Sequence, residues 1–472
     1  MEEKHIRQAA VAGQFYPADR QEAIQELENH FRPFNNCERR NDIQAVIVPH
    51  AGWVFSGEVA ASAFAHIYPD KTYERIFLIG PSHHVYLDAI AVDTASTHYA
   101  TPLGEVEVDS AVCQELAKNQ PLFKYDLRAF QREHCLEVEL PFLQHHLKHM
   151  PPIVPIVIAT DDFAKLIDLN DALAPYFNQH NLWVISSDFS HYPNYDDACK
   201  VDQRMAEAIK SGNVQILGNM VERNEKEHIH GLSTCACGLS GIFTLLLNCH
   251  RDASLTVKHI MYRNSGDSPY GDHDHVVGYH SFILYPDPKA APAFTLDRDE
   301  MATLLQIARE SIQSACTHQP MPVIDINEKL TQPLGAFVTL HKNEQLRGCI
   351  GHFGEDTPLH RIVKEMALAA AFDDPRFPKV TANELDDISI EISVLTPLQR
   401  IQSADEFIYG RQGIYMRKGF RSGTFLPQVA EEVDWTKEEF LGHCARDKAG
   451  IGWNGWRDAE LYTYEAIRFE EG

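Results

Sequence analysis

Three short apolar runs of this sequence end in histidine, namely Ala45–His50, Arg75–His84 and Leu182–His191. Each run is nearly uninterrupted and rich in residues that favour strands, which is typical of strands buried on both faces of a parallel sheet. In such sheets, ligands gather at the carboxyl ends of the strands. The runs therefore predict that several imidazoles meet at one sheet edge, where they would form a metal or acid/base centre.

Strands and helices alternate through the first part of the chain. Ile153–Ala159 is a fourth buried run, Asp19 is placed to cap a helix over 21–31, and Ser56 is placed to cap a helix over 57–66. This alternation predicts an α/β fold, with helices on both faces of a mostly parallel or mixed central sheet. We expect this layered domain to span residues 1–285.

A change of pattern follows residue 285. Residues 286–296 contain three prolines within a short polar and alanine stretch, and these prolines disfavour both a helix and a sheet ladder, so we expect a linker there. Residues 297–472 mix short strands and helices without βαβ regularity, which predicts a smaller α+β domain. Its clearest elements are a helix over 297–316, a hairpin over 335–341 and 346–353, a helix over 358–372, a strand over 388–395 and a helix near 437–446.

Composition narrows the classes of function. A chain of 472 residues predicts two or three domains. The net charge of −25 argues against nucleic acid as a partner, because phosphate binding needs a cationic face. No apolar stretch approaches the roughly 20 residues that cross a bilayer, and the segment Met1–His5 lacks the apolar core of a signal peptide. We therefore expect a cytoplasmic protein without a membrane partner.

Cysteine adds a soft donor near the predicted centre. The ten cysteines form no CxxC pair, so we expect free thiols rather than a zinc ribbon. Cys235 and Cys237 both precede the apolar helix predicted over 239–247, whose N-terminus favours a thiolate. Sequence alone does not choose between them. The run Asp272–His275 is either a further ligand cluster or a polar turn.

Four motifs give the first domain a family resemblance. Gly13–Pro17, Pro49–Gly57, Gly80–His84 and Ser186–His191 occur in the order seen in the Memo family, over residues from about 10 to 285. That family is similar in fold to class III extradiol dioxygenases. The resemblance implies metal ligands at His50, His83 and Cys237.

It also implies a general base at His191, with Asp188 and His134 nearby. His134 lies in the segment Glu133–Glu137, which resembles the family's Glu-His-Ser-Ile-Glu. The dioxygenases use two histidines and a carboxylate as ligands. A thiol in place of the carboxylate departs from that triad and favours copper or iron in a different role.

The second domain carries a candidate site of its own. In the segment Leu346–His352, Arg347 is placed to favour a thiolate at Cys349. His352 lies three residues after Cys349, so the two can share a face only if Gly351 forms a bulge. The alternative is a strand built for packing, with a buried thiol. This segment, together with residues 371–378, 424–430 and 444–450, resembles the AMMECR domain over about 297–470.

A fusion of these two domains resembles part of the AmmeMemoRadiSam system, in which a separate radical-SAM protein is the third component. This chain has no Cys-x3-Cys-x2-Cys signature of its own. We therefore expect a redox or modifying protein that binds iron or copper and acts with a radical-SAM partner. Two alternatives stay open, a metal-binding scaffold without catalysis and thiol chemistry centred on Cys349.

Overall fold

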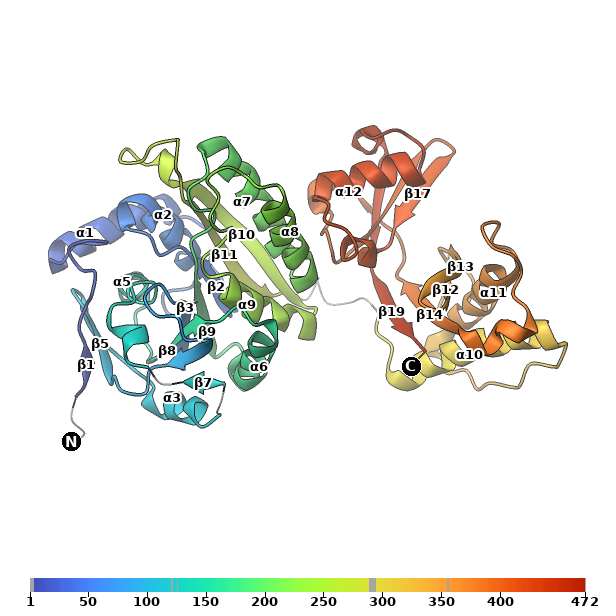
Figure 1. Ribbon diagram of the computed structural model, residues 1–472, viewed down its shortest axis with the longest axis horizontal. Coiled ribbons are helices and arrows are strands. Elements are labelled where there is room, and N and C mark those ends of the chain that lie inside the picture. The colour runs from blue at the N-terminus through green and yellow to red at the C-terminus, as the bar shows by residue number, and fades with distance from the viewer. Residues whose placement is uncertain (1–3, 120–121, 125, 288–293, 355, 472) are drawn as a thin grey trace. The chain divides into compact units, whose positions relative to one another are not determined.

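The computed structural model describes residues 4–119, 122–124, 126–287, 294–354 and 356–471 (Figure 1). The chain divides into two compact units, residues 1–291 and 292–472. Residues 288–293 of the predicted linker lie outside the described residues. Both units mix helices and strands, so the predicted α/β fold class is confirmed.

An eight-stranded mixed sheet forms the centre of the first unit, in the order β10-β11-β2-β9-β3-β8-β4-β7. The four strands β2, β9, β3 and β8 run parallel to one another, and the remaining strands extend the sheet at both edges. The strands are β2 Ala45–Val48, β3 Arg75–Pro81, β4 Ala89–Val92, β7 Phe123–Lys124, β8 Ile153–Ala159, β9 Asn181–Ser186, β10 Leu255–Asn264 and β11 Gly278–Pro286. Every residue of β2, β8 and β9 is buried, as the uninterrupted apolar runs predict.

Helices cover both faces of this sheet. Figure 1 shows α1, α2 and α5 on one side and α6 to α9 on the other. A small second sheet joins β1 Ile6–Arg7, β5 His98–Thr101 and β6 Gly104–Glu107. The helices are α1 Arg20–Phe31, α2 Trp53–Phe64, α3 Ser110–Ala117, α4 Arg128–Gln131, α5 Leu140–His146, α6 Phe163–Leu173, α7 Tyr195–Lys210, α8 Val214–Lys226 and α9 Leu239–Arg251.

Two helix starts show where local signals hold and where they fail. Asp19 caps α1 as predicted, since its carboxylate accepts from the backbone N–H groups of Gln21 and Glu22. The predicted cap at Ser56 is wrong, because α2 begins at Trp53, directly after the turn that carries His50. The hydroxyl of Ser56 lies inside the helix and donates to the carbonyl of Ala51 instead.

The second unit contains two four-stranded sheets, in the orders β13-β12-β14-β19 and β15-β18-β16-β17. Helices α10 and α11 pack against the first of these, and their apolar residues form the core with β12 and β14. Asp297 caps α10 through a capping box with Glu300. The elements are α10 Arg298–Thr317, β12 Gly335–Lys342, β13 Gln345–His352, α11 Leu359–Phe372, β14 Ile388–Leu395, β15 Gln399–Ile401, β16 Gly413–Lys418, β17 Arg421–Phe425, α12 Lys437–His443, β18 Glu460–Tyr464 and β19 Ala466–Glu470.

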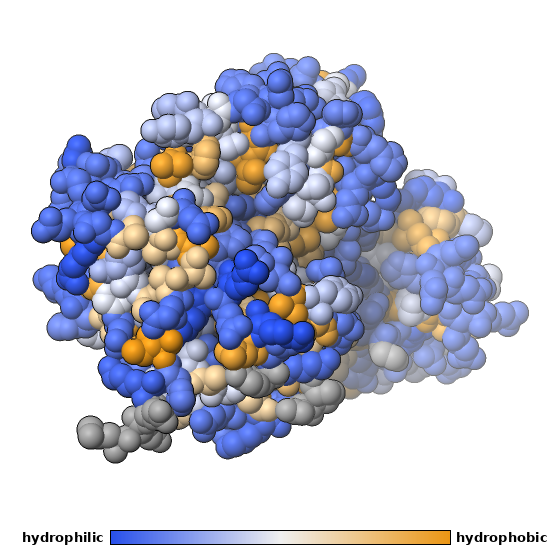
Figure 2. All heavy atoms as spheres, turned by 60° about the vertical axis from the view of Figure 1, so that its left-hand side comes forward, coloured by the Kyte–Doolittle hydropathy of each residue, from blue (hydrophilic) through white to orange (hydrophobic). Residues whose placement is uncertain are grey.

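The surface is mainly polar where it can be seen. Figure 2 shows hydrophilic residues over much of the near face of the first unit, with apolar residues grouped among them. Among the helices of the described residues, none combines the length and the apolarity needed to cross a bilayer.

Candidate metal centre

Three adjacent parallel strands deliver the predicted histidines. Strand β9 lies between β2 and β3, so the three carboxyl ends share one edge of the sheet. His50 follows β2, His83 follows β3, and the segment from Asp188 to His191 follows β9. The geometry expected from the three apolar runs is therefore present.

Three imidazoles form a cluster at this edge. Ring nitrogens of His50, His83 and His134 lie within 4.8 Å of one another. The sulfur of Cys237 lies 3.3 Å from Nε2 of His50, so the thiol contacts the same cluster. Imidazole and thiol donors together suit zinc, copper and iron. The donor set therefore fits a transition-metal ion, and its members are the His50, His83 and Cys237 that the family resemblance implies, with His134 in addition.

Hydrogen bonds at Nδ1 orient two of these rings. Nδ1 of His50 lies 2.8 Å from the hydroxyl of Ser186, and Nδ1 of His83 lies 2.8 Å from Oε1 of Glu133. Metal-binding histidines use one nitrogen as the ligand and the other for such a contact. In both rings Nε2 is therefore the nitrogen available to an ion.

Glu133 is the buried anion that supports the cluster. Besides the ring of His83, its carboxylate accepts from the backbone N–H groups of His83, His134 and Cys135. Burial alone would raise the pKa of Glu133, but its hydrogen bonds and the charge of His83 outweigh burial and lower that pKa to about 2. The ionised carboxylate therefore persists at neutral pH and favours positive charge at the cluster.

His134 is a member of the cluster as well as a neighbour of Asp188. It stands inside the cluster, with its ring centroid 4.5 Å from that of His83. Burial and the neighbouring histidines lower the pKa of His134 to about 4, so its ring is neutral at physiological pH. Phe15, from the first family-like motif, packs against this ring, with the two ring centroids 4.8 Å apart. His134 is thus a fourth candidate ligand, beside His50, His83 and Cys237.

His191 and Asp188 flank the cluster. Nδ1 of His191 lies 2.7 Å from the carbonyl oxygen of Phe189, which can only accept, so this nitrogen carries the proton and Nε2 is free to act as a base. Asp188 accepts from the backbone N–H of His50 at 2.8 Å. Burial raises the pKa of Asp188 although the charge of His191 opposes this. Asp188 thereby fixes the turn that carries His50.

Cys237, and not Cys235, is the thiol at the centre. Both precede α9, but Cys235 is buried beside Asn224, away from the three histidines. Burial and the charge of Asp188 raise the pKa of the Cys237 thiol, and they outweigh the helix N-terminus expected to lower it. The thiol is therefore protonated at neutral pH unless a cation stabilises the thiolate.

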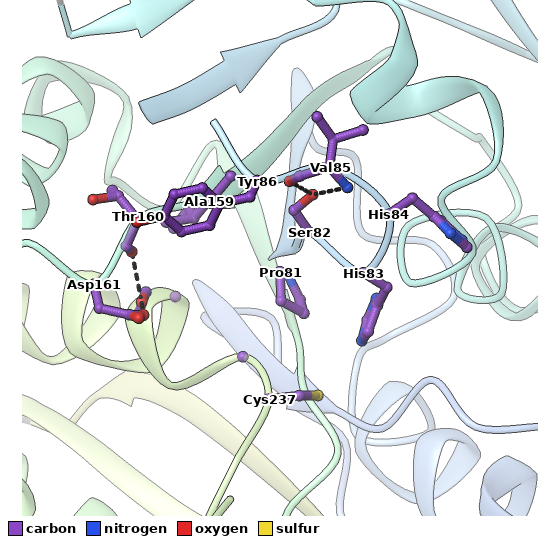
Figure 3. Close-up of a pocket in the computed structure, with 14 residues that line it drawn as sticks. Pro81, Ser82, His83, His84, Val85, Tyr86, Ala159, Thr160, Asp161 and Cys237 are labelled. Carbon is purple, nitrogen blue, oxygen red and sulfur yellow. Dashed lines mark hydrogen bonds between the residues drawn. The ribbon is translucent and has the colours of Figure 1, made fainter. Parts of the chain in front are cut away.

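A cavity of about 360 Å³ opens beside His83 and Cys237. Figure 3 shows His83 directed towards Cys237, whereas His84 points away from it. On the other side the cavity reaches Thr160 and Asp161, and Ser240 of α9 binds both of these residues. A cavity of this size next to the donor cluster gives room for a small molecule or a short side chain.

A buried ion pair ties the amino-terminal segment to the centre. Arg7 donates to Glu137 at 2.6 Å and to the carbonyl of Glu133 at 2.6 Å. Glu137 also accepts from the hydroxyl of Tyr16 and from the backbone N–H groups of Ala10 and Val11. These contacts hold the segment that carries Glu133 and His134 in place. Glu133 and Glu137 belong to the family-like segment around His134, but the sequence carries no local signal for these supporting contacts.

The candidate site of the second unit is not assembled as expected. Strand β13 contains a bulge, but the unpaired residue is Arg347 and not Gly351. The strand is regular from Gly348 to His352, so Cys349 and His352 project from opposite faces and form no dyad. Gly351 is needed for packing instead, because a Cβ there would clash with the ring of Phe337.

Arg347 is also engaged elsewhere. Its guanidinium donates to Glu384 at 3.2 Å and to the carbonyl of Pro378 at 2.8 Å. The half-buried thiol of Cys349 accepts instead from the hydroxyl of Thr339 at 3.2 Å.

Asp272–His275 in the first unit is an exposed polar turn, in which Asp272 accepts from the backbone N–H groups of Asp274 and His275.

Two family models match the chain in sequence. A model described as Memo-like protein matches residues 7–283, and a model described as AMMECR1 matches residues 305–469. The two matches fall in the two compact units, in the order that the motifs imply. The fusion of two domains is therefore confirmed.

Two relatives each match more than half of the chain, and one solved structure matches about a third of it. A MEMO1 family protein of Nitrosopumilus maritimus is 30% identical over 280 residues, which are 58% of this chain and 98% of that protein. A MEMO1 family protein of Methanopyrus kandleri is 31% identical over 288 residues, 59% of this chain and 98% of that protein. A solved structure of an uncharacterized protein from Pyrococcus horikoshii is 37% identical, covers 36% of this chain and 89% of its own, and has a TM-score of 0.34.

Proposed function

We propose that this chain, which belongs to the Memo-like protein family over residues 7–283, binds an iron or copper ion through His50, His83 and Cys237. The observation that supports this most is the convergence of three imidazoles within 4.8 Å, with the thiol of Cys237 in contact with one of them. His134, whose ring nitrogen lies within the same 4.8 Å, is placed to be a further donor.

The chemistry of the donors favours iron or copper. Imidazoles alone suit several divalent ions, but a thiolate adds softness and redox activity. The thiol of Cys237 needs a cation to become a thiolate at neutral pH, and an ion at the cluster provides it. When bound, such an ion would supply redox or Lewis-acid chemistry beside the 360 Å³ cavity.

Adjacent histidines provide a matched test of the site. We expect His83→Ala to weaken iron(II) or copper(I) binding by more than about 100-fold, because it removes a ligand rather than a supporting contact. His84→Ala should weaken binding much less, since His84 points away from Cys237 (Figure 3) and meets the cluster through an edge contact with His134, with ring centroids 6.3 Å apart. Anaerobic equilibrium titrations of the two variants make the comparison. Equal affinities in both variants would contradict the proposed site.

We further propose that the first unit is a redox or modifying enzyme rather than a scaffold. His191 supports this, because its free Nε2 and the neighbouring Asp188 are arranged to move a proton, which a scaffold does not require. A His191→Gln variant should keep a full complement of metal and lose biological function when it replaces the native gene. Full complementation by this variant would favour the scaffold.

The second unit is proposed to bind a separate radical-SAM protein or the substrate. The succession of Memo-like and AMMECR1 matches in one chain supports this proposal. Thiol chemistry centred on Cys349 is less favoured, because Arg347 and His352 do not join that thiol in a reactive group. The test is co-purification of a radical-SAM protein with the tagged full-length chain from its native host under anaerobic conditions. Recovery of the chain without that protein would count against the partner.

A further inference from the structure

A buried carboxyl group lies behind the histidine cluster and takes no part in the function proposed above. The side chain of Glu139 is fully buried at the start of α5. Its Oε1 lies 3.2 Å from the hydroxyl oxygen of Ser186, and its Oε2 has no hydrogen-bond partner among the described residues. An ionised carboxylate in this position would be strongly unfavourable, because a buried charge without a partner loses its hydration and gains nothing in return.

The contacts of Ser186 determine where the protons lie. Its Oγ is 2.7 Å from the carbonyl oxygen of Cys135, 2.8 Å from Nδ1 of His50 and 3.2 Å from Oε1 of Glu139. A hydroxyl has one proton to donate and can accept two. The carbonyl of Cys135 can only accept and is the shortest contact, so the hydroxyl donates there.

The other two contacts must then donate to Ser186. Nδ1 of His50 carries a proton and donates it, which leaves Nε2 of that ring free towards Cys237. With the Ser186 hydroxyl proton directed to Cys135, the 3.2 Å contact between Oγ of Ser186 and Oε1 of Glu139 is satisfied by a protonated Glu139 whose O–H donates. Burial raises the pKa of Glu139 well above its ordinary value, and the charge of the nearby Asp188 raises it further, in agreement with this assignment.

Ser186 can also donate a hydrogen bond to the ionised form of Glu139. If Glu139 loses its proton, the hydroxyl of Ser186 can turn from the carbonyl of Cys135 to the carboxylate and donate to it. In both arrangements His50 donates to Ser186, so its orientation is unchanged. A positive charge at the cluster favours the ionised form, because it attracts the carboxylate two hydrogen bonds away.

We infer that Glu139 is a proton-releasing residue coupled to the metal centre, ionising when a cation occupies the cluster of His50, His83 and Cys237. In this step the O–H bond of Glu139 breaks, the proton passes to bulk water, and no electron is transferred. The carboxylate then offsets one unit of the ion's charge from a position that touches neither the ion nor the substrate cavity. This inference rests on the metal site proposed above, and Glu139 acts through Ser186 and His50.

Counting protons on metal binding tests the inference. Zinc is used because it does not change oxidation state. Calorimetric titrations in several buffers give the number of protons released per zinc ion bound. The pH is held at about 7.5, where ordinary histidines are neutral. The unmodified chain should release about two protons, from Cys237 and Glu139. Glu139→Gln preserves a donor to Ser186 and should release about one proton fewer. Glu107→Gln, at an exposed position in β6, is the matched control and should behave as the unmodified chain.

The possible results separate this inference from the metal site itself. Zinc binding with the same proton count in Glu139→Gln as in the unmodified chain would overturn the role of Glu139 and leave the site intact. Failure of the unmodified chain to bind zinc at all would instead overturn the site. Infrared difference spectra of the unmodified chain repeat the test without a substitution. The band of a protonated carboxyl should be lost when zinc is added, and its persistence would also overturn the inference.

Discussion

Oε1 of Glu133 lies 2.8 Å from Nδ1 of His83, and the same carboxylate accepts the backbone N–H of that histidine at 2.7 Å. The two bonds fix both the position and the tautomer of the ring, so that Nε2 faces His50 and His134. Such supporting carboxylates commonly contribute 10–100-fold to metal affinity. We expect Glu133→Gln to weaken metal binding by about that factor while His83 remains a ligand. An unchanged dissociation constant would show that Glu133 does not support the site.

Glu133 also predicts how stability depends on pH. Its pKa lies at about 2 in the folded chain, against an ordinary value of 4.5. Since the folded-state pKa is the lower one, this residue stabilises the fold fully above about pH 5, by roughly 3 kcal/mol, and loses that contribution as the pH falls towards 2. Urea titrations of the metal-free chain between pH 5 and pH 2 measure the free energy of unfolding. This free energy should fall less steeply with falling pH for Glu133→Gln than for the unmodified chain. Parallel curves would contradict the prediction.

The buried pair of Arg7 and Glu137 should dominate the stability of the amino-terminal segment. Removing one partner leaves the other as an uncompensated buried charge, which typically costs about 3–5 kcal/mol. We expect Glu137→Gln to lower the free energy of unfolding by that amount. Glu115→Gln, which breaks the exposed pair with Lys118, should cost less than about 1 kcal/mol. Similar losses of unfolding free energy in the two variants would mean that the buried pair stabilises the chain no more than the exposed pair does.

Arg347 gives a test within the second unit. It pairs with Glu384 and donates to the carbonyl of Pro378, so its role is structural. Arg347→Lys should destabilise the chain by about 1–2 kcal/mol, because a lysine cannot replace the forked hydrogen bonds. The alkylation rate of Cys349, followed by peptide mass spectrometry, should stay within about twofold of the unmodified chain. A large fall in that rate would restore Arg347 as an activator of the thiol.

Much of the centre could be predicted from the sequence because parallel strands fix where their ends lie. The buried runs before His50, His83 and His191 place these residues at one edge whatever the order of the strands. The order itself, with β9 between β2 and β3, depends on tertiary pairing and has no local signal. The family resemblance, and not periodicity, indicated Cys237 in place of Cys235.

Other features depend on contacts between distant segments. Ser186 meets Glu139 and Cys135 across about 50 residues of chain, and nothing in either segment indicates the pairing. The bulge in β13 occurs at Arg347, whereas the side chain of Phe337 from the neighbouring strand occupies the space beside Gly351. The predicted cap at Ser56 failed because α2 starts directly at the turn of His50, where Asp188 holds the backbone.

The metal content and electronic spectrum of the protein purified without oxygen test the central claim most directly. The account predicts about one iron or copper ion per chain and a thiolate charge-transfer band, both lost in His50→Ala, with the band alone lost in Cys237→Ser if the histidines still retain the ion. Absence of bound metal in the unmodified protein, even after reconstitution with either ion, would contradict the account.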